Sequence, residues 1–298
     1  MLFHALALLA ILGLARAATV TKRQAITTLS SAQIESYKPY TFYAAAAYCQ
    51  PSLTLSWSCG EKCTGNPTFQ PYASGGDGSA VQFWYAGWDP SLSSVIVAHQ
   101  GTDPTKFLAD LIDGDLILGS LDSTLFPGLS SSIQVHQGFA NEQAKTAQTI
   151  LAAVLTLLEQ HSASSVVVTG HSLGAALALL DSVYLPLHLP EGTSVSMIGY
   201  GMPRVGNSAF ADYVDVMDSG SLTHINNKKD PIPIVPGRFL GYTHPAGEVH
   251  IQASGAWDVC PGQDNPSDLC IVGDVPSIFR GKLSNHNGPY DDGIVMGC

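Results

Sequence analysis

One serine in this sequence stands in a setting that suits a nucleophile. Ser172 lies between Gly170 and Gly174 in a G-x-S-x-G pattern. Residues 166–169 favour a short buried strand before it, and the alanine- and leucine-rich residues 175–180 favour a helix after it. A tight turn between such a strand and helix exposes a serine hydroxyl, and the helix N-terminus stabilises negative charge that develops there. We therefore predict that Ser172 is a nucleophile.

A serine hydroxyl needs a base, and the base needs an acid that holds it in one tautomer. After an elbow of this kind, the acid and then the histidine follow the serine along the chain. Asp230 is the best acid, because it follows a predicted strand at 222–225 and because Pro231 and Pro233 can hold its loop rigid. The other acids after the serine lack such a position at a strand end; they are Asp212, Asp215, Asp218 and Glu248.

Four histidines are candidates for the base. His224 lies in a predicted strand and precedes Asp230, while His244 and His250 flank a turn that leads into a strand. His286 lies on a late loop rich in turn-forming residues. Chain order and loop position favour His286 over His244, but the residues alone leave both open.

Acyl transfer to a serine also needs two hydrogen-bond donors for the oxyanion. The backbone N–H of Leu173, directly after the serine, is one candidate. The other is Thr102, which follows a predicted strand at 95–98; its N–H would donate and its hydroxyl would hold the loop. The alternative is that residues 101–103 form only a turn that ends a strand.

The elements that must position these residues alternate between strands and helices. Further strands are predicted at 81–85 and 195–200, and helices at 30–48, interrupted or kinked near Pro39, and at 139–161. This alternation predicts an α/β fold, with a mostly parallel central sheet flanked by helices and with its chemistry at the carboxyl ends of strands.

Residues 1–17 are typical of a secretory signal peptide, an apolar stretch that ends in the small-x-small site Ala15-Arg16-Ala17. Lys22-Arg23 is either a processing site or a pair of solvated charges, so residues 18–23 are a candidate propeptide. Residues 24–298 are then predicted to form a single secreted domain. No later stretch has about 18 uninterrupted apolar residues, so we expect no transmembrane segment.

The chain is acidic, with a net charge of −11 that becomes −14 once residues 1–23, with three basic residues and no acid, are removed. Such a charge disfavours nucleic acid and anionic lipid headgroups as partners and leaves neutral substrates open. Six cysteines behind a signal peptide favour three disulfides. Because C-x-x-C and H-E-x-x-H patterns are absent, we expect no metal site.

Seven segments resemble the fungal class 3 lipases, secreted enzymes of the α/β-hydrolase fold that act on acylglycerols. They are HQGT at 99–102, VHQGF at 135–139, GHSLGAALA at 170–178, PRVGN at 203–207, DPIPIVP at 230–236, YTHPAGEVHI at 242–251 and HNGPY at 286–290. They occur in family order and span most of the mature chain, which is most similar to the mono- and diacylglycerol lipase branch.

The resemblance implies roles for the candidate residues. It assigns His244 to a turn-and-strand segment and so selects His286 as the base. The implied triad is Ser172, Asp230 and His286, the implied oxyanion residues are Thr102 and Leu173, and the implied disulfides are Cys49–Cys298, Cys59–Cys63 and Cys260–Cys270. Many relatives have Arg before the first Gly of the oxyanion segment and Trp near position 250, where this chain has Gln100 and His250.

Residues 103–113, which begin at Asp103, are predicted to form a short amphipathic helix. Its apolar face would consist of Phe107, Leu108, Leu111 and Ile112. Composition alone favours an ordinary surface helix, whereas in the family the segment after Thr102 is a lid. An apolar face over an apolar cleft opens when lipid replaces water. We also expect Phe126, Pro127 and Leu129 to add to an acyl groove.

These observations favour a secreted, cofactor-free, monomeric lipase that cleaves acylglycerol esters, above all mono- and diacylglycerols, at a lipid–water interface through an acyl-enzyme at Ser172. The rival enzyme is an esterase for feruloylated or other non-lipid esters, against which the apolar Phe107-Leu108 pair argues. The rival from another class is a lipid-binding, lipase-like protein without turnover. An intact set of Ser172, Asp230 and His286 argues against it.

Overall fold

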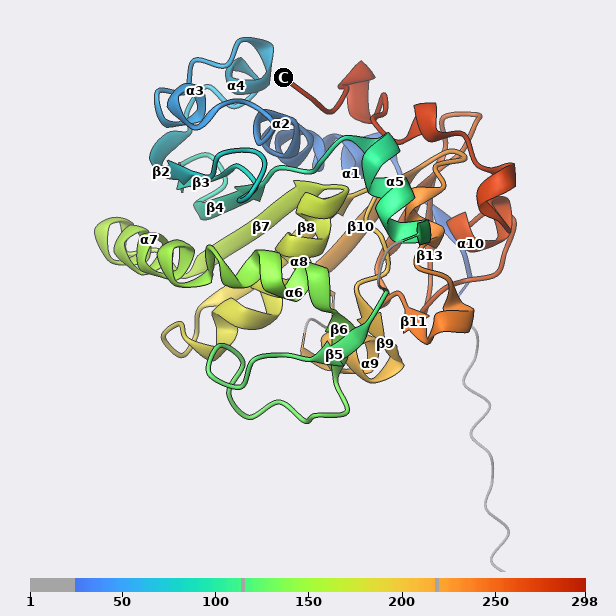
Figure 1. Cartoon of the computed structure of the whole chain (residues 1–298). Helices are drawn as coiled ribbons and strands as arrows, with labels where there is room; N and C mark the ends of the chain where they lie inside the picture. Colours follow the sequence, from blue (N-terminus) through green and yellow to red (C-terminus); the bar gives the residue numbers. More distant parts are fainter. Residues whose placement is uncertain (1–24, 114–115, 218–219) are drawn as a thin grey trace, which may run out of the picture.

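The computed structural model describes residues 25–113, 116–217 and 220–298 (Figure 1). The expected signal peptide and propeptide lie outside the described residues and stay predictions. A nine-stranded sheet crosses the described chain. In the order in which they lie in the sheet, its strands are β1 (Thr27–Thr28), β13 (Trp257–Cys260), β12 (Glu248–Ile251), β10 (Leu222–Asn227), β8 (Ser194–Tyr200), β7 (Ser165–His171), β4 (Ser94–His99), β3 (Trp84–Asp89) and β2 (Gln70–Gly75).

The five central strands, from β12 to β4, are parallel, and the two strands at each edge are antiparallel. The register places His99 beside Gly170 and His171 beside Tyr200. The parallel strands β4, β7 and β10 therefore have their carboxyl ends at the same end of the sheet. The candidate oxyanion residue, nucleophile and acid follow these three strands. The predicted α/β architecture is confirmed.

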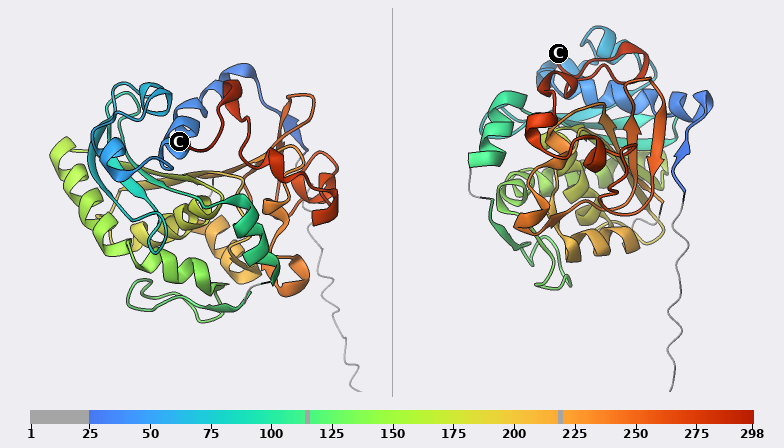
Figure 2. Two further views of the ribbon diagram at one scale, coloured as in Figure 1. Left: turned by 45° about the horizontal axis from the view of Figure 1, so that its top comes forward. Right: turned by 90° about the vertical axis from the view of Figure 1, so that its right-hand side faces the viewer.

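Helices cover both faces of this sheet (Figures 1 and 2). They are α1 (Ser31–Glu35), α2 (Lys38–Ala46), α3 (Pro51–Leu55), α4 (Glu61–Thr64), α5 (Pro104–Asp113), α6 (Gln137–Ala144), α7 (Ala147–His161), α8 (Leu173–Tyr184), α9 (Ser208–Met217) and α10 (Ile271–Asp274). Short 3-10 turns are η1 (Leu185–Leu187), η2 (Ile232–Ile234), η3 (Arg238–Leu240), η4 (Ile278–Arg280), η5 (Leu283–Asn285) and η6 (Asp291–Gly293).

The core has a layer on each side of the sheet, because side chains of a strand alternate between faces. Val166 and Val168 of β7 pack in the layer that contains α7 and α8. Val167, between them, packs in the opposite layer with Tyr43 and Ala46 of α2. A second, antiparallel sheet contains β11 (Tyr242–Thr243), β9 (Gly206–Asn207), β6 (Gln134–His136) and β5 (Leu118–Ser120).

Two predicted helices are divided in the structure, the first of them as expected. The helix predicted at 30–48 breaks before α2, where Pro39 occupies the first turn, a position that tolerates its missing N–H. The helix predicted at 139–161 is α6 and α7, which meet at Thr146. The Thr146 hydroxyl donates to the carbonyl of Gln143, and such local bonds compete with a helix. The strand predicted at 81–85 is β3, which begins at Trp84.

The six cysteines of the described chain form three disulfides. They are Cys49–Cys298, Cys59–Cys63 and Cys260–Cys270, the pairs that the family resemblance implies. The first joins residues 249 positions apart. Among the described residues, the helices are too short or too polar to cross a membrane.

Candidate active site

The turn between β7 and α8 has the geometry of a nucleophile elbow. Ser172 has φ 60° and ψ −126°, a conformation that residues with a side chain rarely adopt. A Cβ on Gly170 would collide with the carbonyl of Gly174, and a Cβ on Gly174 with the carbonyl of His99. Both flanking positions therefore require glycine. The Ser172 side chain is buried, and its Oγ has no hydrogen-bond partner among the described residues.

Asp230 and His286 form a buried pair at the same edge of the sheet. The His286 Nδ1–H donates to Asp230 Oδ2 at 2.7 Å, and both side chains have an exposed fraction of 0%. The Ile232 N–H donates to the other carboxylate oxygen at 2.9 Å, which fixes the carboxylate. With its proton on Nδ1, the imidazole has Nε2 free to accept one, and this atom has no partner in the described chain.

The His286 ring lies against the elbow. Its centroid is 4.3 Å from that of His171, the residue directly before Ser172. Gly201 lies against the acid–base pair: at φ 54°, a Cβ there would be 2.9 Å from His286 Cε1 and 3.0 Å from Asp230 Oδ2. Position 201 therefore requires glycine, because any side chain there would collide with the Asp230–His286 pair.

The structure places His244 in a different pair. Its ring stacks on that of His224 with a centroid distance of 4.8 Å, and its Nε2 bonds to the carbonyl of Pro233 at 2.7 Å. Burial, together with the positive charge of Arg204, lowers the pKa of His244 to about 3. Such an imidazole, held against a carbonyl and away from Asp230, is a structural group.

The oxyanion segment packs directly on the elbow. A Cβ on Gly101 would be 2.5 Å from the carbonyl oxygen of His171 and 3.1 Å from Ser172 Cβ. Gln100 joins this segment to the neighbouring chain, because its Oε1 accepts the Phe83 N–H at 2.9 Å. Thr102 follows Gly101 directly, and Leu173 begins α8 directly after Ser172. Their roles as oxyanion donors stay predictions.

The segment after Thr102 is the expected short helix, α5. Asp103 caps it, since its Oδ1 accepts the N–H groups of Thr105 and Lys106, both at 3.0 Å. Phe107 and Leu111 are 4% and 3% exposed and pack in the core layer of α8. Ile112 is 45% exposed, so only part of the predicted apolar face packs on the core.

A largely apolar cavity of about 560 Å³ lies beside α5. Its walls come from the end of α5, from the segment after Asp230 and from the segment after α10, and include Leu111, Ile234, Val235, Val275 and Ile278. The prediction that Phe126 adds to an acyl groove is wrong. Phe126 is buried with its ring 5.7 Å from that of Tyr184, the last residue of α8, whereas Ser172 precedes the first.

The described residues contain two clusters of three potential metal ligands, and neither suits a metal. In one, Cys260 and Cys270 are joined as a disulfide and offer no thiolate to a metal beside Glu248. In the other, Lys38 already pairs with two carboxylates, Glu35 and Asp292.

Comparison with known proteins gives the family. Residues 96–240 match the model for lipase (class 3). A secreted mono- and diacylglycerol lipase of Malassezia globosa is 31% identical over 72% of this chain and 73% of its own length. The chain belongs to the class 3 lipase family. It is a secreted carboxylic ester hydrolase.

Other matches extend the likeness over nearly the whole chain. A second secreted mono- and diacylglycerol lipase of Malassezia globosa is 36% identical over 65% of this chain and 68% of its own. A solved triacylglycerol lipase, described as having a serine protease triad as its catalytic centre, is 26% identical with a TM-score of 0.76. That match covers 92% of this chain and 99% of the other.

A hydrogen-bond relay in this lipase was not foreseen from its sequence. The Tyr48 hydroxyl accepts the Gly101 N–H and bonds to His171 Nδ1 at 2.6 Å. His171 Nε2 bonds to the carbonyl of His286 at 2.8 Å, as does the Tyr290 hydroxyl at 2.9 Å. Burial, and then the neighbouring His286, hold the pKa of His171 well below its usual range. His171 is therefore neutral, donating through Nε2 and accepting from Tyr48.

The relay joins three catalytic segments that are far apart in the sequence: the oxyanion segment, the elbow and the loop of the base. Tyr48 lies just beyond α2, next to Cys49, and belongs to no recognisable motif. Only the packing of α2 against the sheet brings its hydroxyl to Gly101.

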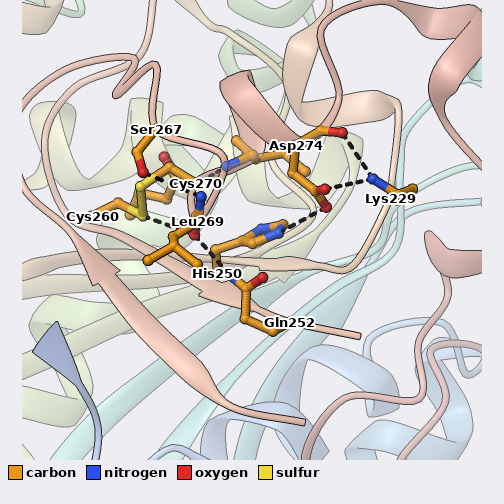
Figure 3. Close-up of polar contacts among 10 residues, drawn as sticks. Lys229, His250, Gln252, Cys260, Ser267, Leu269, Cys270 and Asp274 are labelled. Atoms are coloured by element: carbon orange, nitrogen blue, oxygen red, sulfur yellow. Dashed lines mark hydrogen bonds and ion pairs between the residues drawn. A yellow bond between two sulfur atoms is a disulfide. The ribbon is translucent and has the colours of Figure 1, made fainter. Parts of the chain in front are cut away.

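A second contact network anchors the loop of the acid (Figure 3). Lys229, directly before Asp230, donates to the backbone carbonyl of Asp274 at 3.0 Å and to its Oδ1 at 2.5 Å. The buried His250 lies 3.4 Å from Asp274 Oδ2. The disulfide Cys260–Cys270 holds the start of α10 in place, so the far end of this short helix is fixed where it meets Lys229.

Proposed function

We propose that this lipase hydrolyses acylglycerol esters at a lipid–water interface, with mono- and diacylglycerols as its preferred substrates. The observation that carries the proposal is the buried Asp230–His286 pair, which packs against an elbow with strained backbone at Ser172. The secreted relatives named as mono- and diacylglycerol lipases support the substrate class.

In this proposal, Ser172 Oγ attacks the ester carbonyl while His286 Nε2 takes its proton. Asp230 keeps the other ring nitrogen protonated and stabilises the imidazolium that forms. The N–H groups of Thr102 and Leu173 receive the oxyanion, and the N-terminus of α8 adds a favourable field.

Collapse of the tetrahedral intermediate breaks the bond between the acyl carbon and the glycerol oxygen. His286 returns its proton to that oxygen, which leaves as a hydroxyl group. Water, deprotonated by the same nitrogen, then attacks the acyl carbon. The bond from that carbon to Ser172 Oγ breaks, His286 returns the proton to Oγ, and a fatty acid leaves. The overall reaction adds one water across the ester bond and needs no cofactor.

The apolar cavity beside α5 supports a long acyl chain as part of the substrate. Ser172 is fully buried, and α5 follows the oxyanion segment with Phe107 and Leu111 packed in the core layer of α8. In this proposal, the helix moves before an ester reaches the Ser172 hydroxyl. When the helix opens, Phe107 and Leu111 become exposed. Their exposure to water is unfavourable, and contact with lipid removes this free-energy cost. This arrangement favours acylglycerols over small soluble esters such as feruloyl esters.

The nucleophile is tested with Ser172→Ala and a matched control, Ser182→Ala. Ser182 is also buried in α8, but its Oγ donates to the Leu179 carbonyl and it lies away from the site. We expect Ser172→Ala to fold and to bind lipid, but to lose nearly all hydrolysis and nearly all labelling by a phosphonate, a covalent inhibitor of catalytic serines. The control should keep its hydrolysis and its labelling. Labelling of any other residue, or unchanged hydrolysis, would refute the assignment.

The substrate class is tested with a panel of mono-, di- and triacylglycerol, a phospholipid and methyl ferulate, each above and below its solubility. We expect turnover of the partial glycerides to rise sharply once they aggregate. Turnover of the ferulate alone would replace the proposal with a non-lipid esterase, and binding without any turnover would replace it with a lipid-binding protein.

A further inference from the structure

Two phenylalanines on this lipase are almost fully exposed, and each adjoins an arginine. Phe239 is 89% exposed and Phe279 is 91% exposed. Phe239 follows Arg238 in η3, and Phe279 precedes Arg280 in η4. Scattered apolar residues are normal on a surface, but these aromatic rings contribute nothing to the core and stand on tight 3-10 turns.

Both turns border the same apolar cavity. Phe239 and Leu240 line it from η3, and Ile278 lines it from η4, while Ile112 lines it from α5. Leu240 and Ile112 are themselves 40% and 45% exposed. We call Ile112, Phe239, Leu240 and Phe279 the apolar rim. Figure 2 (right) looks onto this side of the molecule, where α5 lies beside the orange and red segments that contain η3 and η4.

The two arginines leave positive charge at this rim. In the described residues, neither Arg238 nor Arg280 forms an ion pair, and both are exposed. Arg280 lines a smaller pocket with Asp268, Asp274 and Lys229, but Lys229 already neutralises Asp274. The whole chain has a net charge of −11. At physiological salt, charges act over about 8 Å, so the local arginines decide which surface approaches the rim.

Exposed aromatic rings beside arginines fit a lipid surface that carries anionic groups. The rings insert among acyl chains while the guanidinium groups bind carboxylates in two-point contacts. Hydrolysis supplies that carboxylate, because each cleaved ester leaves a fatty acid that stays in the lipid surface and a glycerol hydroxyl.

We propose that the apolar rim and its two arginines dock the enzyme on a lipid surface that contains fatty-acid carboxylates, its own reaction product. The proposal rests on the proposed acylglycerol hydrolysis and reverses the expectation that anionic lipid surfaces are disfavoured. It makes the reaction self-promoting: each turnover makes the surface more anionic and holds the enzyme there more tightly. Hydrolysis of a neutral emulsion then begins with a lag, which added oleate removes.

The test measures partition of the full-length mature protein onto phosphatidylcholine vesicles, with and without oleate, at a pH where oleate is ionised. Every protein carries Ser172→Ala, so that the vesicle composition stays constant. The variants are Phe239→Ser with Phe279→Ser, and Arg238→Gln with Arg280→Gln. The control is Leu55→Ser, on α3 far from α5, where the leucine is 48% exposed.

We expect the phenylalanine pair to lower partition onto both kinds of vesicle, by roughly 100-fold in total. The arginine pair should lower it only on oleate vesicles, by about 30-fold, and Leu55→Ser should change neither. Equal binding of the arginine variant to oleate vesicles would overturn the proposal. A parent that dimerises, together with a phenylalanine variant that is monomeric but partitions normally, would also overturn it, because the rim would then be a self-association surface.

A second measurement separates this proposal from the proposed function. With Ser172 intact, kcat/KM for a dispersed acetate ester, whose acyl group is too short to fill the cavity, should be the same in the parent, the arginine variant and the control. A parent that hydrolyses the soluble ester but no acylglycerol would count against the proposed substrate. Lag-free hydrolysis of a neutral acylglycerol emulsion by the parent would count against product-dependent docking alone.

Discussion

Tyr48→Phe removes one oxygen atom from the relay and leaves the ring in place. In the folded enzyme that oxygen accepts the Gly101 N–H and donates to His171 Nδ1. Burial raises the pKa of the Tyr48 phenol, so the group stays protonated and donates at every working pH. The variant therefore leaves one donor and one acceptor without their partner, directly beside the elbow.

The size of the effect follows from where these two groups lie. An unpaired buried polar group costs about 1–3 kcal/mol, and here both sit in segments that form the oxyanion site. Loss of a whole oxyanion donor reduces kcat by about 100- to 1,000-fold, whereas this variant only loosens the residue before Thr102. We expect kcat for a soluble ester to fall about tenfold, with KM within about twofold of the parent, because the loosened group acts on the transition state.

Tyr85→Phe is the matched control. Tyr85 is equally buried and its hydroxyl donates to the carbonyl of Tyr43 at 2.8 Å, but the site does not use it. Thermal unfolding should show a loss of stability in both variants, and steady-state kinetics should show a loss of kcat in Tyr48→Phe alone. If the two variants lose stability equally and keep the parent kcat, the relay is structural and the reasoning fails.

Three further substitutions test other contacts. Gly201→Ala should lower kcat by roughly 100-fold, because its methyl group displaces the His286 ring; an active variant in steady-state assays would mean that the ring tolerates movement. Leu111→Ala should raise kcat/KM for dispersed ester about tenfold by weakening the closed packing of α5, whereas Ile112→Ala should not; equal effects would contradict the closed state. Burial raises the pKa of Glu248 to about 7. Between pH 4.5 and 7 the carboxyl ionises in the unfolded chain before it ionises in the folded one, so the free energy of unfolding falls as pH rises. Glu248→Gln should therefore gain about 2–3 kcal/mol in free energy of unfolding over the parent between pH 4.5 and 8 in urea titrations, and a constant difference would exclude this coupling.

The nucleophile and the acid could be predicted from the sequence because each depends on the geometry of a short segment. The glycines beside Ser172 and the strand end before Asp230 are properties of short segments, and the order of strands in a parallel sheet brings such ends together. The choice of His286 over His244 was different. From the residues alone it stayed open, because what separates the two is which carbonyl or carboxylate each ring meets after folding.

The parts that sequence reasoning missed depend on packing between distant segments. Nothing near Tyr48 indicates that its hydroxyl meets Gly101, and nothing near Gly201 indicates that a side chain there would strike His286. Phe126 shows the reverse error, since an apolar residue near a predicted lid was assigned to a groove but fills the core beside Tyr184. Apolar character predicts that a residue is buried and leaves open which surface it meets.

The bond between Cys49 and Cys298 makes a covalent ring of nearly all the chain that performs the chemistry. A protease that cuts one surface loop inside this ring opens it without releasing a fragment. The piece with the nucleophile and the piece with the histidine stay tethered at high effective concentration and can return to their places. We therefore expect the enzyme to keep its activity after a single cut in one of these surface loops.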